Sequence, residues 1–325
     1  MRANPGILVR GIGLVLLGWI LSRVDGDRLW QLWLQVDVAQ LWAVPLLGLA
    51  MTGVRALRWR GMLRLQALEV SRWRALLVYS SGIFLGSFTP GRLGDLGKAL
   101  YLRRELGLTW EKALAGAVAD RLLDLAVMLV LGVWALFQLG LVRVGWVPWI
   151  GAGVGLLMVG WFFALSTRMN RNTGLLPALR ANRFGRLLRG MAAEMAGLAG
   201  WPGVRMVALT AMAYGLYFTQ TYLLARAQGL PLSAAEVSAA VVLVGLASFL
   251  PISIAGLGTR EGILILIMGQ RGVAASTEAG VTYSTLFFLS CFVFPAAVGA
   301  LCWLKAPLPL KAANERGDER NLDCG

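Results

Sequence analysis

The sequence has 325 residues, of which 58% are hydrophobic and 15% are charged, whereas a soluble domain is about half apolar and about a quarter charged. The net charge of +14 is carried by short segments between apolar runs, a distribution typical of cytoplasmic loops and not of a nucleic-acid-binding surface. No histidine is present, which excludes His-based metal sites and Ser-His nucleophiles. We therefore expect no cofactor, no metal and no nucleic-acid partner.

Six apolar runs are long enough to cross a bilayer as helices. In chain order they cover residues 5–22, 38–54, 113–138, 146–166, 206–225 and 276–304. We interpret the first as an uncleaved signal anchor and not as a signal peptide, because it lacks an A-x-A cleavage site. The pattern predicts an all-α polytopic membrane protein with about six transmembrane helices.

Two further apolar runs, 75–90 and 237–252, are shorter, and each ends at a turn that contains proline and glycine. Basic residues are abundant on both sides of the first run and scarce on both sides of the second. Because basic loops remain in the cytoplasm, the first run should enter and leave from the inside and the second from the outside. We predict two re-entrant helical hairpins and two cytoplasmic termini, in the cell membrane.

The two hairpins resemble each other in sequence. Ser-Phe-x-Pro occurs at 87–90 and again at 248–251, and Leu-Gly follows at 93–94 and at 257–258. We interpret this as an inverted repeat with halves at about 38–138 and 206–304, as in transporters with sites near the midplane. The alternative is that proline and glycine recur wherever membrane helices break. The expected helix breaks contain Pro90, Gly91, Gly94, Pro251, Gly256 and Gly258.

The remaining segments are more polar. We expect residues 1–304 to form one transmembrane domain and the tail 305–325 to be cytoplasmic and disordered. Segment 167–205 has apolar residues on one helical face and arginines mostly off it. It is therefore predicted to lie on the cytoplasmic membrane surface as an amphipathic helix, with a plain solvated linker as the alternative.

Three charges lie inside the expected span 113–138, where a charge costs at least about 2.5 kcal/mol at the helix centre. Asp120 and Asp124 are four residues apart and share one helix face, with Arg121 beside it. Such charges are usually paired and often functional. Two interpretations stay open at this point: a functional site, or a structural ion pair with Arg92 or Lys98.

Charged residues also flank the two expected helix breaks. Arg260 and Glu261 follow the second break, and Arg92, Asp95 and Lys98 flank the first. Broken helices present free backbone N–H groups, and arginine offers a bidentate fork that suits phosphate. The alternative is that Arg260 and Glu261 only neutralise each other.

These motifs carry a family resemblance. The stretch TPGRLGDLGKALYLRRELGLTWEKALAGAVADRLLDL (89–125), with LPISIAGLGTREG (250–262), resembles the lysylphosphatidylglycerol synthase transmembrane region, also called the flippase-like or UPF0104 family. The resemblance covers almost the whole chain up to about Leu304. It implies a membrane domain that flips lipids; in bifunctional relatives this domain moves an aminoacylated phospholipid made by a cytosolic catalytic domain. Asp95 and Asp120 stand where relatives often have glutamate, which leaves the lipid open.

The first functional hypothesis is a lipid translocase for an anionic or aminoacylated phospholipid or a polyprenyl-phosphate lipid. Arginine and lysine at the two breaks would hold the phosphate, and the carboxylates would balance those charges or bind a cationic headgroup. Only residues 305–325 follow the last span, so we expect no synthase activity. No GxxxxGK[ST] motif is present, so uphill transport would need an ion gradient or a partner.

Two alternatives remain from the sequence. A membrane-embedded transferase could bind Mg²⁺ on Asp120 and Asp124. A non-transporting subunit could instead support a separately encoded lipid synthase or glycosyltransferase, with the basic segment 167–205 as the docking surface. The sequence is compatible with a homo-oligomer.

Overall fold

A computed structural model describes residues 15–87, 89, 97–141, 201–249 and 256–305, and within these ranges the chain is helical with no strand. The all-α prediction is confirmed for this part of the chain. Residues 15–21 are helical. The other helices are α2 (Gly26–Leu34), α3 (Val38–Leu41), α4 (Ala43–Leu65), α5 (Arg72–Ser87), α6 (Gly97–Glu105), α7 (Trp110–Gln138), α11 (Trp201–Ala227), α12 (Ala234–Phe249), α13 (Thr259–Gln270), α14 (Ser276–Phe288), the π-helical η2 (Leu289–Val293) and α15 (Phe294–Lys305).

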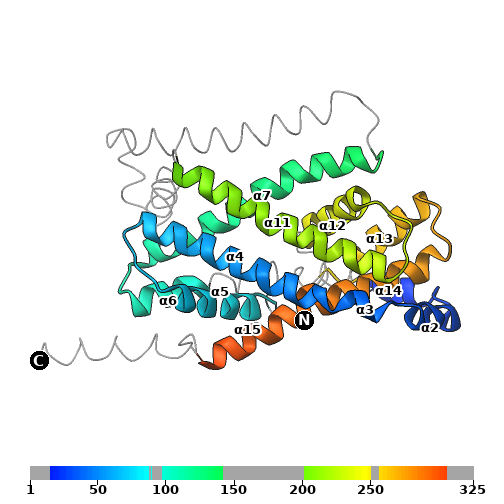
Figure 1. Ribbon diagram of the computed structural model, residues 1–325, viewed down its shortest axis with the longest axis horizontal. Coiled ribbons are helices and arrows are strands. Elements are labelled where there is room, and N and C mark those ends of the chain that lie inside the picture. The colour runs from blue at the N-terminus through cyan, green and yellow to red at the C-terminus, as the bar shows by residue number, and fades with distance from the viewer. Residues whose placement is uncertain (1–14, 88, 90–96, 142–200, 250–255, 306–325) are drawn as a thin grey trace, which may run out of the picture.

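The expected span at 146–166 and most of segment 167–205 and of the polar tail lie outside the described residues. The long helices α4, α7, α11 and α14–α15 extend along the long axis of the molecule (Figure 1). The stretches Val38–Leu65 and Ser276–Lys305 are long and apolar enough to cross a membrane. Only 28% and 17% of their most apolar windows are buried inside the protein. Most residues in these windows are therefore at least partly exposed on the surface of the protein.

Exposed tryptophans gather near the two ends of the long axis. Trp30 and Trp42 lie near one end, beside α2 and α3, and Trp73, Trp110 and Trp201 begin α5, α7 and α11 at the other end (Figure 1). Tryptophan is enriched at the two membrane–water interfaces. The exposed indole rings are therefore concentrated toward the two ends of the long axis.

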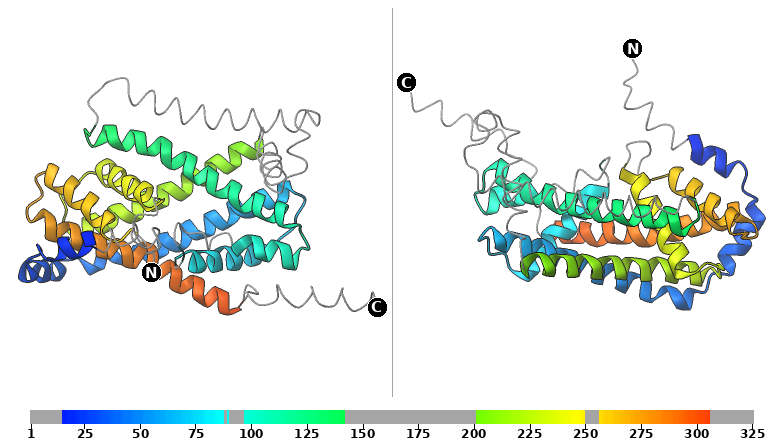
Figure 2. Two further views of the ribbon diagram at one scale, coloured as in Figure 1. Left: turned by 180° about the vertical axis from the view of Figure 1, so that it is seen from behind. Right: turned by 90° about the horizontal axis from the view of Figure 1, so that it is seen from above.

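Two pairs of helices, α5 with α6 and α12 with α13, are each joined by an ion pair near one end of the molecule. Arg74 in the first turn of α5 pairs with Glu105 at the end of α6, with an N–O distance of 3.1 Å. Glu236 in the first turn of α12 pairs with Arg271 just after α13, also at 3.1 Å. Both pairs of helices are thus closed at their outer ends, and Figure 2 shows the second pair opposite the first. The inner connections, with Pro90, Gly91, Gly94 and Pro251, lie outside the described residues.

The helices pack in reciprocal pairs. The last helix of residues 38–138, α7, lies against α12. The last helix of residues 206–304, α15, lies against α5, and α4 and α11 pack on each other. Glycines allow close approach at two of these contacts. A Cβ on Gly132 of α7 would meet Leu246, one on Gly245 of α12 would meet Met128, and one on Gly299 of α15 would meet backbone of α5.

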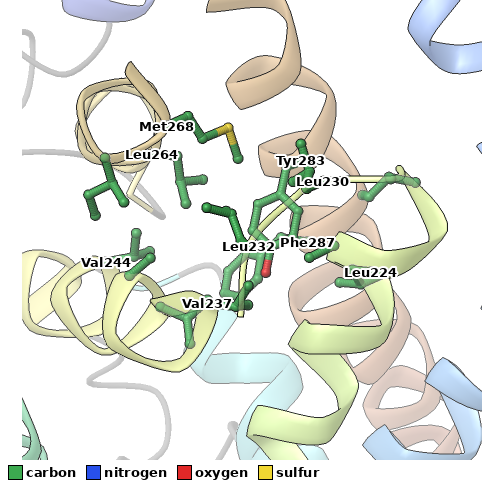
Figure 3. Close-up of a cluster of buried hydrophobic side chains, with 14 of the residues drawn as sticks. Leu224, Leu230, Leu232, Val237, Val244, Leu264, Met268, Tyr283 and Phe287 are labelled. Carbon is green, nitrogen blue, oxygen red and sulfur yellow. The ribbon is translucent and has the colours of Figure 1, made fainter. Parts of the chain in front are cut away.

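Most of the core in the described part of the chain belongs to two apolar clusters. The larger one fills the space between α11, α12, α13 and α14 (Figure 3), with Leu224, Val237, Leu264 and Tyr283 among its buried members. The smaller one is built around Trp59 and Leu63 of α4, Tyr79 of α5 and Leu102 of α6. Each cluster surrounds one of the two hairpins and fixes the helix ends that carry the charged residues.

Candidate functional site

Four buried charges form an ion-pair network between α4, α6 and α7, which we call the arginine–aspartate network. Arg58 donates from Nη2 to Asp120 at 2.8 Å and from Nη1 to Asp124 at 2.7 Å. Lys98 Nζ donates to the other oxygen of Asp120 at 2.8 Å. Arg58 is 1% exposed and Asp120 is 0% exposed. The two cations and two carboxylates neutralise each other, which is the condition for burying charges at this depth.

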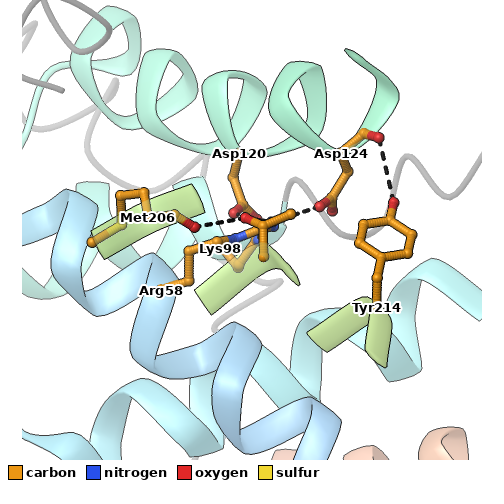
Figure 4. A network of polar contacts seen from close by, with 7 residues as sticks. Arg58, Lys98, Asp120, Asp124, Met206 and Tyr214 are labelled. Atoms are coloured by element: carbon orange, nitrogen blue, oxygen red, sulfur yellow. Dashed lines mark hydrogen bonds and ion pairs between the residues drawn. The ribbon is translucent and has the colours of Figure 1, made fainter. Parts of the chain in front are cut away.

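A fourth helix joins the arginine–aspartate network through hydroxyl groups. Thr210 of α11 accepts a hydrogen bond from Arg58 at 3.1 Å, and the Tyr214 hydroxyl donates to the backbone oxygen of Asp124 at 3.4 Å. Lys98 also lies on the ring of Tyr79, 4.4 Å from its centroid. Figure 4 shows how these side chains converge between the helices. The network therefore cross-links helices of both halves.

Sequence reasoning missed Arg55 and Arg58 as members of a site. The apolar run was expected to end at residue 54, and the arginines after it were counted as part of a cytoplasmic loop. In the structure α4 continues to Leu65, with Arg58 buried and Arg55 half-buried at the lining of a cavity. The signal was present in the apolar residues at helical spacing beyond the run, which extend the buried face of the helix. These residues are Ala56, Trp59, Met62 and Leu63.

A cavity of about 100 Å³ lies next to the arginine–aspartate network, where α7 crosses α12. We call it the central cavity. Its polar lining residues are Arg55, Arg121, Asp124, Tyr214, Tyr217 and Ser248. Its apolar lining includes Met51, Met128, Phe287 and Phe292. The cavity is smaller than the about 300–1,000 Å³ of a typical ligand pocket, so it has room for a small polar group and not for a whole lipid.

The lining of the central cavity contains two arginines that are not part of the arginine–aspartate network. Arg58 and Lys98 already balance Asp120 and Asp124, so Arg55 and Arg121 bring two further cations to the lining. The Nε atom of Arg55 is buried and has no hydrogen-bond partner among the described residues. A buried donor without a partner is costly, and an anion in the cavity would supply one.

A second charged cluster occupies the start of α13. Gly256 and Gly258 have φ angles of +78° and +82°, which glycine adopts without strain. Glu261 accepts a hydrogen bond from the Gly258 N–H at 2.6 Å and pairs with Arg260 at 2.7 Å. Arg260 Nε also donates to the Ser284 hydroxyl of α14. Residues 256–258 thus form a turn before α13, and this turn holds the charged residues in place.

This second cluster lies against the central cavity. The guanidinium of Arg260 stacks 5.0 Å from the Phe288 ring and 5.9 Å from the Phe287 ring, and Phe287 lines the cavity. Ser248 also lines the cavity, and its hydroxyl oxygen would be 3.1 Å from a Cβ placed on Gly256. Arg260 Nη1 is buried and has no hydrogen-bond partner within the described ranges. The two clusters thus approach the same cavity from different halves.

The structure brings together most of the residues that the sequence singled out. Lys98 pairs with Asp120, and this ion pair is one of the two interpretations that the sequence left open. Asp124 and Arg121 line the central cavity. Arg260 pairs with Glu261 beside the cavity. Arg92 and Asp95 lie outside the described residues. Besides the two arginines of α4, sequence reasoning missed Tyr214 and Tyr217, which read as ordinary aromatic residues of an apolar helix.

The carboxylates do not suit a metal ion. Both oxygens of Asp120 accept from cations, and Arg58 holds one oxygen of Asp124. No group of three or more potential ligands occurs in the described part of the chain. Asp120 and Asp124 therefore do not form a free carboxylate pair for Mg²⁺, which needs oxygens that are not already occupied by cations.

Comparison with known proteins assigns this chain to a family. The family model described as the lysylphosphatidylglycerol synthase TM region matches residues 6–299. The chain belongs to this family. The resemblance expected from the sequence is therefore confirmed, and the protein is a membrane protein of a family connected with lipid metabolism.

A relative in Methanothermobacter thermautotrophicus supports this membership. It is described as a UPF0104 membrane protein and is 22% identical over 306 residues, which cover 86% of this chain and 89% of the relative. No solved structure matches this lysylphosphatidylglycerol synthase TM-region protein.

Proposed function

We propose that the protein moves a phospholipid with an anionic or aminoacylated headgroup, or a polyprenyl-phosphate lipid, between the leaflets of the cell membrane. The observation that carries the proposal is the central cavity, which joins cationic and apolar surfaces at the contact of the two halves. Arg55 and Arg121 would hold the phosphate of the headgroup. Asp124 and the tyrosine hydroxyls would contact an amine or hydroxyl of the same headgroup. Lipid tails would remain in the bilayer, since the cavity of about 100 Å³ does not accommodate them.

The arrangement of the two halves supports a transporter. α5–α6 and α12–α13 enter from opposite ends, and the contacts of α7 with α12 and of α15 with α5 are reciprocal, as a two-fold relation requires. Lys98 and Arg260 are each the second residue of the returning helix, and each donates to the long helix that follows. We therefore infer an inverted repeat with re-entrant hairpins, an architecture that places substrate sites near the midplane.

Charge gives the proposed orientation. The end of the molecule where α4 and α6 finish and α5, α7 and α11 begin carries many arginines (Figure 1). By the positive-inside rule this end faces the cytoplasm, in a multi-pass arrangement with both termini inside. In this orientation the α5–α6 hairpin enters from the cytoplasm and the α12–α13 hairpin from the outside.

A reconstituted transport assay tests the proposal. The full chain is placed in liposomes that contain fluorescent phosphatidylglycerol, an aminoacylated analogue or a polyprenyl-phosphate lipid, and dithionite quenching reports the leaflet of the label. We expect faster exchange for at least one headgroup. Arg55→Gln should slow that exchange by about tenfold or more, because one charge-assisted hydrogen bond is lost. Arg226→Gln, an exposed arginine of α11 away from the cavity, should leave the rate unchanged.

The possible results separate the alternatives. Normal exchange by a correctly folded Arg55→Gln protein would remove the central cavity from the mechanism. No acceleration for any lipid by folded wild-type protein would favour the interpretation as a non-transporting subunit of a separately encoded synthase or glycosyltransferase. Co-purification of the chain with such an enzyme would then be the next measurement.

A further inference from the structure

A second pocket, separate from the central cavity, lies at the arginine-rich end of the molecule. Its volume is about 190 Å³. We call it the basic pocket, and it is lined by Leu57, Arg60, Gly61, Arg64, Arg72 and Arg205. Four of its six lining residues are arginines, and they come from α4, α5 and α11. None of its lining residues is acidic.

The basic pocket is built by one face of α4. Leu57, Gly61 and Arg64, together with Arg60, follow the i, i+3, i+4, i+7 spacing that places side chains on one side of a helix. Gly61 allows Met206 of α11 to approach, since a Cβ at this position would meet the methionine methyl group. α11 therefore packs close beside this face and brings Arg205, the residue before Met206, to the same pocket.

Within the part of the chain that the structure describes, the charge of the basic pocket is largely unbalanced. Arg60 donates from Nε to the backbone oxygen of Val70, which fixes its guanidinium at the pocket wall. The side chains of Arg64, Arg72 and Arg205 make no hydrogen bond or ion pair with another described residue. Four guanidiniums that converge on one hollow repel each other, and each can offer a forked pair of donors to phosphate oxygens. The chemistry favours an anion with more than one negative charge.

The position of the basic pocket favours an anion carried by a lipid. Trp201 is four residues before Arg205 and is 79% exposed, and Trp73 follows Arg72 and is 61% exposed. These rings mark the level at which a membrane–water interface is expected. Leu57, 42% exposed, continues the pocket toward the apolar surface of α4. A headgroup at the arginines would thus leave its acyl chains beside Leu57.

We infer that the basic pocket binds the phosphomonoester headgroup of a membrane lipid. It is a site distinct from the central cavity: Arg55 precedes Arg60 by five residues, about 7.5 Å along α4. The pocket would collect an anionic lipid from the leaflet at this end of the molecule. This inference does not depend on whether the protein moves lipids, because binding is measured without transport.

The test is equilibrium binding to the purified full chain in detergent, followed by tryptophan fluorescence. The probes are short-chain phosphatidate, short-chain phosphatidylcholine and the soluble ester glycerol 3-phosphate, all at one ionic strength. We expect phosphatidate to bind more tightly than either of the other two. Arg64→Gln/Arg205→Gln should weaken phosphatidate binding by about tenfold or more, as expected when two charge-assisted contacts are lost.

The matched control is Arg103→Gln/Arg104→Gln, which removes the same charge from α6 at the same end of the molecule. Phosphatidate binding should change by less than about twofold in this variant, because surface charges outside the pocket are screened by salt. Equal weakening in both double variants would overturn the inference in favour of general surface attraction. Equal binding of glycerol 3-phosphate and phosphatidate would overturn the lipid assignment in favour of a soluble phosphate ester.

Discussion

The two halves of the molecule each bury a cation near the start of a helix, but they surround it with different numbers of charged residues. In each half a cation at the second residue of the returning helix lies on aromatic rings and donates to the next long helix. In the first half, Lys98 belongs to a network that connects α4, α6, α7 and α11. In the second half, Arg260 pairs with its sequence neighbour Glu261 and with Ser284. The first arrangement therefore connects four helices, whereas the second connects only α13 and α14.

Arg58→Met should give the largest effect, because it removes the centre of the first arrangement. Asp124 would lose its ion-pair partner while it stays buried, and Asp120 would keep only Lys98. Breaking a buried pair in this way lowers the free energy of unfolding by about 3–5 kcal/mol. Unfolding of purified protein in mixed micelles of mild detergent and dodecyl sulfate measures the change. Arg226→Met, at an exposed position, serves as the control and should shift the transition by less than about 0.5 kcal/mol.

Glu261→Gln should have a smaller effect, about 2 kcal/mol, in the same unfolding measurement. The amide can still accept a hydrogen bond from the Gly258 N–H, but it leaves Arg260 without a counter-charge. Ser284 and the two phenylalanine rings continue to hold the guanidinium. A loss as large as that of Arg58→Met would mean that the second cluster stabilises the fold as much as the first, which would contradict the comparison.

The glycine contacts between α15 and α5 and between α12 and α7 also differ. A Cβ on Gly299 would meet the carbonyl oxygen of Ser80 and backbone of Phe84, whereas one on Gly245 would meet only the flexible end of Met128. Gly299→Ala should lower the free energy of unfolding by about 1 kcal/mol, because backbone cannot move aside. Gly245→Ala should cost less, since a methionine can change rotamer. Equal losses for the two alanine variants would contradict the difference in packing.

Part of this site could be predicted from the sequence. The charges of α7 and of the start of α13 stand in apolar surroundings, and the cost of burying them makes them recognisable in the sequence alone. The partner Arg58 could not be identified in the same way, because it lies in a basic stretch that also fits a cytoplasmic loop. Hydropathy averages over a window, whereas the burial of one arginine depends on which face of the helix it occupies.

The fold, like the site, could be predicted from the sequence only in part. A turn at Gly256 and Gly258 could be predicted because glycine adopts backbone conformations that other residues rarely allow. The packing of α7 on α12 and of α15 on α5 depends on contacts between residues more than a hundred positions apart, which no local pattern specifies. The central cavity is a product of that packing, so its tyrosines could be recognised only in three dimensions.

The ion pairs that close the two hairpins differ in one respect. Peptide dipoles make a helix start positive and a helix end negative. Glu236 at the start of α12 and Arg271 at the end of α13 complement these partial charges, whereas Arg74 at the start of α5 and Glu105 at the end of α6 oppose them. The outer turns of the α5–α6 hairpin therefore depend on their ion pair to offset an unfavourable macrodipole. Those turns are the ones that will fray first when salt screens the pair.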